Sequence, residues 1–447
     1  MVLGITIPLT LLLLYMYCMW VYRKCTYAFP FAIIFLIEII WGTISIVWID
    51  QGVYITEQLR YSHFTGASIR YICLIAPFAI VFPWKLNRLI SRDIERPRRA
   101  ARLEISGFPI NSAILLVGAV CVAYLYLDLF ISGVPLLNAA ISKSNYFPVY
   151  SKLPLTNAIH NYVFPFLTLF CGIKVSTYEK VSKTRVKCIL IFSLILIYQL
   201  LLKNKFYGLY NYLVWFIIPI LIVNYKKLKL MKRIPIKAVV AVLLCVSCVL
   251  FICYNQYSNA SYVGGNPMQY LLDRLFALQS HTFWGVDYNV QNDIAGFDLS
   301  NLFKEIAYGF SGGTYGNAEY GIGKVMYAVT AKTYADDMIK SGFLFAGNFA
   351  TVALSYSGYI LTFIFSFTLG FIVSHISYVF YKYIQLENFI GLFFSFWMYL
   401  RFFEFYRVGS LSMILSWKMI VIYCFIAFLV LYPRVNQSAY NIREDDL

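Results

Sequence analysis

The stretch FAIIFLIEIIWGTISIVW, residues 31–48, decides the fold class of this chain. It contains a single ionisable side chain, Glu38, within an otherwise apolar or neutral run. A run of about 20 residues is what an α-helix needs to cross the hydrocarbon core of a bilayer. Comparable runs recur, so the sequence predicts an all-α polytopic integral membrane protein with about eleven transmembrane helices. They occupy residues 4–22, 27–48, 65–84, 110–132, 156–173, 187–202, 209–224, 236–253, 349–373, 387–402 and 410–432.

The composition excludes a soluble globular domain. Of the 447 residues, 60% are hydrophobic and only 13% are charged, whereas soluble domains are about half apolar and about a quarter charged. The formal net charge of +16 would suggest nucleic-acid binding in a soluble protein. Here the basic residues act first as topology signals, so no nucleic-acid partner is expected.

Strongly basic connections between the predicted helices alternate along the chain with less basic ones. The positive-inside rule places the basic connections in the cytoplasm, so the amino terminus faces out and the tail NIREDDL, residues 441–447, faces in. Residues 1–22 have neither a charged start nor a small-residue cleavage site, which favours a first membrane helix over a signal peptide. The basic groups are Arg23 and Lys24; Lys85, Arg88, Arg92, Arg96, Arg98, Arg99 and Arg102; Lys174, Lys180, Lys183, Arg185 and Lys187; and Lys226, Lys227, Lys229, Lys232, Arg233 and Lys237.

The connection from 254 to 347 is far longer than an ordinary loop. Apolar residues recur at helical spacing in NPMQYLLDRLFALQSHTFW, residues 266–284, and in LSNLFKEIAYGF, residues 299–310. We expect short helices folded back onto the outer membrane surface, joined by a glycine-rich segment, 309–323, that is either a mobile flap or a plain turn region. The expected parts are helices one to eight (1–253), this extracytoplasmic loop (254–347), helices nine to eleven (348–432) and a cytoplasmic tail (433–447).

Cations are expected at the outer membrane boundary. Guanidinium forks and ammonium groups suit phosphate oxygens, so Lys205, Arg274, Arg401 and Arg407 are candidates to bind a lipid diphosphate. Aromatic residues such as Trp284 either stack on sugar rings or belong to the ordinary interfacial belt, and the second interpretation is favoured for the class as a whole.

Several short motifs resemble the Wzy-type O-antigen and capsule polymerases. The chain has an arginine followed by ten residues and a glycine, Arg274 to Gly285, in its large outer loop. Further similarities are SGVPLLNAAISK (132–143), KNKFYG (203–208) and YRVGSL (406–411). The first of the two outer loops that carry the pattern in some family members corresponds to 133–155, which has lysines and no arginine, so this chain departs from those members.

The resemblance implies a GT-C-like glycosyltransferase in the cytoplasmic (inner) membrane of a bacterium, with its active site facing the periplasm. Its substrate would be an undecaprenyl-diphosphate-linked oligosaccharide, which it would join into O-antigen or capsular polysaccharide. The expected partners are this substrate, membrane lipids and a polysaccharide chain-length regulator. An O-antigen ligase is the alternative enzyme, and a lipid-linked oligosaccharide flippase is the alternative of another class. A flippase should show internal repeats and little outer domain, whereas this chain has most of its loop residues in one outer segment. This distribution favours an enzyme.

The chemistry defines what such a site needs. Fixed cations would stabilise the departing diphosphate, and a carboxylate or imidazole would deprotonate the incoming hydroxyl. His281 and Glu404 are the candidate bases. His281 follows Arg274 by seven residues, which would place both on nearly the same face of one helix. Glu404 is equally consistent with a salt bridge to neighbouring arginines, and His281 with a hydrogen-bonding loop residue.

The remaining substrate contacts are assigned to Gly285 and Trp284. The outer loops contain no D-x-D motif, so we expect neither a metal nor another cofactor.

Ionisable residues inside the predicted spans should face the bundle interior or a wet cavity, because their burial in hydrocarbon is costly. They are Glu38, Asp128, His160 and Lys418. Proton-coupled transport and structural pairing both account for them. Arg70 is a possible partner for Glu38.

Overall fold

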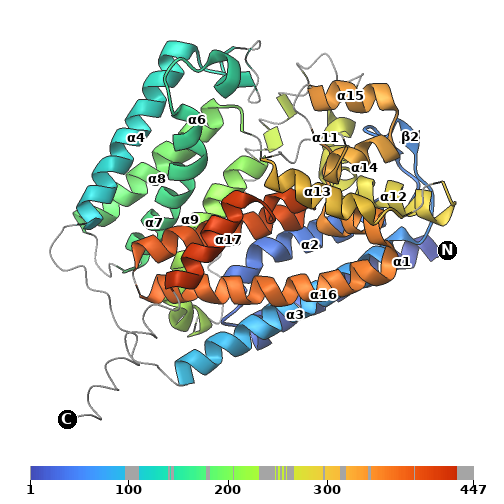
Figure 1. Cartoon of the computed structure of the whole chain (residues 1–447), viewed down its shortest axis with the longest axis horizontal. Helices are drawn as coiled ribbons and strands as arrows, with labels where there is room; N and C mark the ends of the chain where they lie inside the picture. The colour runs from blue at the N-terminus through green and yellow to red at the C-terminus, as the bar shows by residue number, and fades with distance from the viewer. Residues whose placement is uncertain are drawn as a thin grey trace. The chain divides into compact units, whose positions relative to one another are not determined.

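In the part of the chain that it describes, the computed structural model consists of helices and their connections, with one short hairpin (Figure 1). It describes residues 2–95, 110–138, 141, 145–177, 182–204, 206–230, 247, 250–251, 254–255, 258, 266–294, 297–312, 319–340, 344–386 and 388–429. The all-α prediction is confirmed. The hairpin, β1 (Tyr54–Ile55) and β2 (Arg60–Tyr61), was not predicted.

Six helices among the described residues are long and apolar enough to cross a membrane, which supports a multi-pass membrane protein. Two shorter apolar helices, Gly208–Ile222 and Trp417–Leu429, coincide with other predicted runs. Most of the predicted run 236–253 lies outside the described residues. The six are Phe29–Ile49, Ala67–Ile94, Ala113–Ser132, Thr156–Ser176, Lys183–Leu201 and Phe349–Gln385.

The chain divides into two compact units, residues 1–102 with 269–447 and residues 103–268. The first unit contains α1 (Val2–Lys24), α2 (Phe29–Ile49), α3 (Ala67–Glu95), α16 (Phe349–Gln385) and α17 (Phe389–Val408). In it, α3 and α16 lie side by side along much of their length (Figure 1). Gly370 permits this approach, since a Cβ there would lie 3.2 Å from the backbone of Phe78.

Proline residues inside α3 explain one of its cross-helix bonds. Pro83 has no N–H, so the carbonyl of Ala79, four residues earlier, has no helical donor. The hydroxyl of Tyr17 on α1 donates to that carbonyl at 2.7 Å. A membrane helix tolerates proline when a neighbouring side chain satisfies the freed backbone group in this way.

The second unit is built from α4 (Ile110–Ser132), α7 (Phe164–Thr177), α8 (Lys183–Leu201) and α9 (Phe206–Leu230). Before α7 lie η1 (Tyr146–Tyr150), α6 (Thr156–Ala158) and η2 (Ile159–Val163). Asp128, buried at the end of α4, accepts hydrogen bonds from the Tyr146 hydroxyl at 2.8 Å and from the Lys152 and Leu153 amides at 3.0 Å. This carboxylate therefore fixes the connection that follows α4, and structural pairing accounts for it.

The long loop supplies five further helices to the described residues: α11 (Pro267–Phe276), α12 (His281–Gln291), α13 (Ser300–Phe310), α14 (Gly321–Val329) and α15 (Lys332–Lys340). The predicted short helices are thus present. The loop does more than cover a surface, because its turn between α11 and α12 runs along α2. Ser45 donates to the Ala277 carbonyl at 3.0 Å, and Ser280 donates to the Gly42 carbonyl at 2.8 Å.

Candidate functional site

Arg274 and His281 are brought together by Glu57, a residue of the hairpin turn. Glu57 Oε2 lies 3.0 Å from His281 Nε2, and Glu57 Oε1 lies 3.5 Å from Arg274 Nη2. We call Glu57, Arg274 and His281 the carboxylate cluster. The prediction that Arg274 and His281 share one helix face was wrong, because α11 ends at Phe276 and α12 begins at His281.

The two ring nitrogens of His281 have different neighbours. Nδ1 lies 2.8 Å from the Leu278 carbonyl oxygen, which can only accept, so Nδ1 must carry the proton of that hydrogen bond. Nε2 lies 3.0 Å from Glu57 Oε2, but neither atom has a hydrogen-bond partner among the described residues, so the contact is a close approach and not a hydrogen bond. The contact is an ion pair when both ring nitrogens carry a proton.

Exposure separates the roles within the carboxylate cluster. The His281 side chain is 0% exposed, Glu57 is 12% exposed and Arg274 is 39% exposed. Arg274 also receives support from Tyr270, whose hydroxyl accepts from Nη2 at 2.8 Å. In this conformation Glu57 and Arg274 reach the surface, whereas His281, the predicted base, does not.

The hairpin turn is tied to the loop on both sides of Glu57. Thr56 donates to Asp273 at 3.2 Å, and Gln58 Nε2 donates to the His281 carbonyl at 2.7 Å. Burial raises the pKa of the Asp273 carboxyl, and the bond from Thr56 opposes that rise. These bonds hold Glu57 against His281. Sequence reasoning missed Glu57, because no local motif in the short connection 50–66 sets it apart.

Gly285 and Trp284, the predicted substrate contacts, are both buried. A Cβ on Gly285 would lie 2.7 Å from Val329 Cγ1 and 2.9 Å from Gln58 Nε2, so a glycine here permits close packing. Trp284 is 1% exposed, and its Nε1 donates to the His63 carbonyl at 3.4 Å. Neither residue offers a surface on which a sugar could stack in this conformation.

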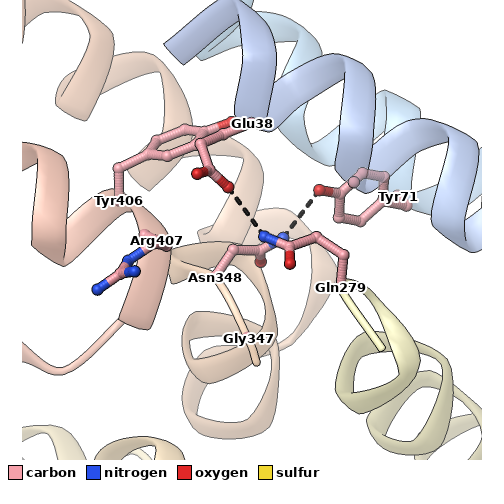
Figure 2. A pocket seen from close by; sticks show the side chains of 8 residues that line it. Glu38, Tyr71, Gln279, Gly347, Asn348, Tyr406 and Arg407 are labelled. Atoms are coloured by element: carbon pink, nitrogen blue, oxygen red, sulfur yellow. Dashed lines mark hydrogen bonds between the residues drawn. The ribbon is translucent and has the colours of Figure 1, made fainter. Parts of the chain in front are cut away.

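The predicted cations of α17 separate into two environments. Arg401 Nη1 lies 2.8 Å from Glu404 Oε2, both side chains being about one-third exposed, which agrees with the salt-bridge interpretation of Glu404. Arg407 instead lines a buried cavity with Glu38 (Figure 2). Lys205, the remaining predicted cation, lies outside the described residues.

The cavity beside Glu38 is polar and small. Gln279 from the loop donates to Glu38 Oε2 at 2.9 Å, and Asn348 donates to the Tyr71 hydroxyl at 2.8 Å (Figure 2). Glu38 is 5% exposed, and its Oε1 has no hydrogen-bond partner. The space open to the centre of a water molecule is about 10 Å³, enough for about one water. The cavity is therefore too small for a sugar.

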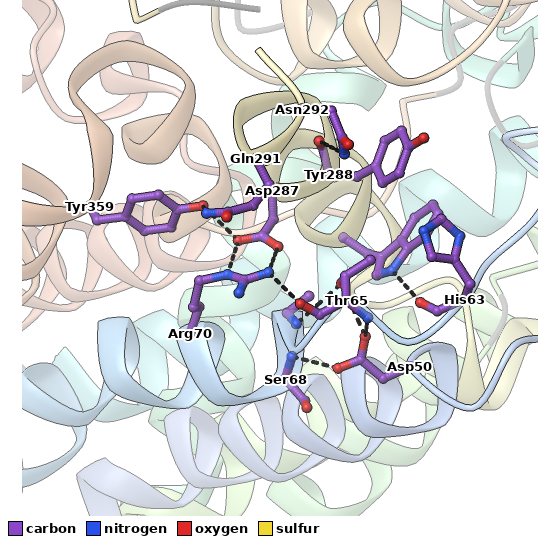
Figure 3. Close-up of polar contacts among 12 residues, drawn as sticks. Asp50, His63, Thr65, Ser68, Arg70, Asp287, Tyr288, Gln291, Asn292 and Tyr359 are labelled. Carbon is purple, nitrogen blue, oxygen red and sulfur yellow. Dashed lines mark hydrogen bonds and ion pairs between the residues drawn. The ribbon is translucent and has the colours of Figure 1, made fainter. Parts of the chain in front are cut away.

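Arg70 does not pair with Glu38, so that prediction was wrong. Its Nε and Nη2 donate to the two oxygens of Asp287 at 2.8 and 2.6 Å (Figure 3). The Tyr359 hydroxyl also donates to Asp287, at 2.9 Å. The bidentate pair joins α12 to α3, and the tyrosine adds α16. Asp287 is fully buried and well supplied with donors, which is typical of a structural ion pair.

Within the described part of the chain, no three His, Cys, Asp or Glu side chains are grouped as metal ligands. At the surface, the carboxylate cluster presents the Glu57 carboxylate, a group that can accept a proton, beside the Arg274 guanidinium, a group that can bind an anion.

Residues 316–423 match a family of unknown function, DUF6418. This segment begins after the carboxylate cluster and includes α14 to α17. Neither the comparison with curated proteins nor that with solved structures gave a match.

Proposed function

We propose that this protein is a GT-C-like membrane glycosyltransferase with about eleven spans that polymerises lipid-diphosphate-linked oligosaccharide repeat units. It would act at the periplasmic face of a bacterial inner membrane on undecaprenyl-diphosphate-linked glycan. The observation that carries the proposal is the carboxylate cluster, in which a partly exposed arginine lies beside a carboxylate that is itself paired with a buried histidine.

The reaction requires one proton acceptor and one anion-binding group. An acceptor hydroxyl attacks the anomeric carbon of the donor, and its proton passes to Glu57. The new carbon–oxygen bond forms while the bond to the diphosphate breaks, and the diphosphate leaves with that electron pair. Arg274 stabilises the charge developing on the leaving group. Carboxylates are the usual bases of glycoside chemistry.

This proposal reassigns the base from His281 or Glu404 to Glu57. His281 then acts through Glu57, because its buried ring lies against the second carboxylate oxygen, with Nε2 3.0 Å away. The α17 arginines, Arg401 and Arg407, and Lys205 remain proposed diphosphate ligands. A chain-length regulator remains a proposed partner, and the scheme uses no metal.

The experiment compares surface polysaccharide on gels from cells that lack the gene and carry the wild-type chain, Arg274→Ala or Glu57→Gln at matched membrane abundance. Lys324→Ala is the control, since Lys324 is an exposed cation of the same loop paired only at 3.9 Å with Asp298. We expect a full ladder from the wild type and the control, and a single repeat unit on core from the two site variants. A full ladder from both site variants contradicts the proposal, and loss of even the single unit in the null cells indicates a ligase or flippase.

A further inference from the structure

Arg60 differs from its charged neighbours, because no carboxylate of the described part of the chain pairs with it. Within the described residues, Arg70 pairs with Asp287, Arg274 with Glu57 and Arg401 with Glu404. Among the described residues, the side chain of Arg60 makes one hydrogen bond, from Nε to Gln58 Oε1 at 3.0 Å. Its Nη2 is buried without a hydrogen-bond partner. A half-buried guanidinium in this state has donors available for an anion.

Aromatic rings hold this guanidinium in place. Arg60 Cζ lies 4.9 Å from the Trp284 ring centre and 5.2 Å from that of Tyr288. These two rings stack on each other at 5.5 Å, and the His63 ring meets both edge-on. Figure 3 shows Tyr288 and His63 beside the ion pair of Asp287. A guanidinium held over aromatic rings keeps its N–H groups at its periphery, where they can still donate hydrogen bonds.

The local electrostatics also favour an anion. Burial lowers the pKa of Arg60, and the nearby Tyr288 only partly opposes that shift. The group stays protonated at any physiological pH. Desolvating a cation without a counter-ion is costly, so an oxyanion that supplies the missing charge gains more here than at a cation already paired.

We propose that Arg60 anchors an oxyanion subsite that binds a phosphate, diphosphate or carboxylate group in bidentate fashion at the edge of the guanidinium. Nη1 is neither hydrogen-bonded nor among the buried unpaired atoms, so it provides the accessible donor. Nη2 lies in the same plane of the guanidinium, and a shift of the side chain that uncovers it supplies the second, parallel donor.

The subsite adjoins the carboxylate cluster through a single residue. Gln58 accepts from Arg60 with its oxygen and donates to the His281 carbonyl with its nitrogen. In this respect the inference rests on the proposed function, since it gives the anionic substrate a second contact beside Arg274. Two sources share the required chemistry: the diphosphate of the lipid-linked donor, and an acidic sugar of the glycan.

Binding to the purified full-length chain in nanodiscs tests the inference without turnover. The probes are farnesyl diphosphate, inorganic pyrophosphate and glucuronate, each titrated against wild type, Arg60→Gln and Arg60→Lys. Lys324→Gln is the control, because it removes the same charge from an exposed site of the loop. Thermal melting of each variant establishes that it is folded.

We expect Arg60→Gln to weaken anion binding by about 10- to 100-fold, the range for losing hydrogen bonds to a charged group. Arg60→Lys should fall between, since an ammonium keeps the charge but not the fork. The control should remain within about twofold, because screened surface charges contribute little. Weaker binding of both farnesyl diphosphate and pyrophosphate by Arg60→Gln identifies the diphosphate leaving group as the ligand. Weaker binding of glucuronate alone identifies an acidic sugar.

Unchanged binding of all three probes in folded Arg60→Gln would overturn the subsite. Failure of the proposed function is distinguishable from this result. If the chain binds pyrophosphate through Arg60 and the Glu57→Gln variant still gives a full ladder, the subsite stands and the proposed chemistry is wrong.

Discussion

The Glu57 carboxylate faces the His281 imidazole at 3.0 Å, and the second nitrogen of that ring lies against the Leu278 carbonyl at 2.8 Å. A hairpin turn and the start of a loop helix thus meet at this contact. Because the ring is fully buried, removal of either partner leaves the other as a polar group without this contact, which is costly.

Breaking this pair should destabilise the protein as well as inactivate it. We expect His281→Ala to lower the free energy of unfolding by about 3 kcal/mol, as for removal of one partner of a buried ion pair. The double variant with Glu57→Gln should lose less than the sum of the single losses, with a coupling of about 0.5–3 kcal/mol. Thermal or denaturant melts of the four proteins measure the coupling, and strict additivity would show that the two side chains do not interact.

Stability should depend on pH through Glu305. Burial raises the pKa of this carboxyl from 4.5 to about 7, against opposing hydrogen bonds from Tyr356 and the Leu411 and Ser412 amides. Its folded-state pKa lies above the unfolded value, so the unfolded chain loses this proton first as pH rises. The contribution of Glu305 to the free energy of unfolding is complete below about pH 4.5. It declines as the pH rises through 7, by a total on the order of 3 kcal/mol.

Melts of wild type and Glu305→Gln between pH 4.5 and 8 test this linkage. The substitution keeps the shape of the side chain and removes the titration, so its stability should vary less over that window. An identical pH profile for both proteins would assign the dependence to other groups.

The two arginines of α17 should differ in their effect on stability. Arg401→Gln should cost less than about 1 kcal/mol, because exposed ion pairs are weak, and its pair with Glu404 is about one-third exposed. Arg407→Gln should cost about 3 kcal/mol, because Arg407 shares a cavity with the buried Glu38. Melting temperatures of the two variants, made with the same charge change, provide the comparison. Equal effects would mean that the cavity does not depend on Arg407.

Gly285 should be required for packing. Gly285→Ala places a Cβ within 2.7 Å of Val329 and 2.9 Å of Gln58, and overpacking of this kind costs about 1–3 kcal/mol. Displacement of Gln58 should also disturb the hairpin turn and reduce activity. A variant with wild-type stability and activity would show that α12 and α14 can separate without consequence.

The sequence predicted the elements that depend on local pattern. Apolar runs of sufficient length identified most of the membrane helices, and helical periodicity identified α11 and α13 within the loop. Arg274 and His281 were also recognised as candidate residues, since their chemistry is intrinsic to the side chains.

What the sequence did not reveal depends on long-range contacts. A continuous helix through residues 266–284 would have placed Arg274 and His281 on one face. Instead, Ser280 bonds to Ser45 and Gly42 of α2, and these tertiary hydrogen bonds interrupt the helix. Glu57 became recognisable only once the hairpin lay against α12. Arg70 likewise pairs with Asp287, which is distant in sequence, and not with Glu38.

The most direct test of the account is transfer by the purified chain in liposomes supplied with a lipid-diphosphate-linked oligosaccharide, with products separated on a gel. The account predicts that wild type forms a ladder of joined units and releases lipid diphosphate, while Glu57→Gln at equal abundance forms almost none. A ladder from Glu57→Gln equal to that of wild type, or no joined product from a folded wild-type chain, would contradict it.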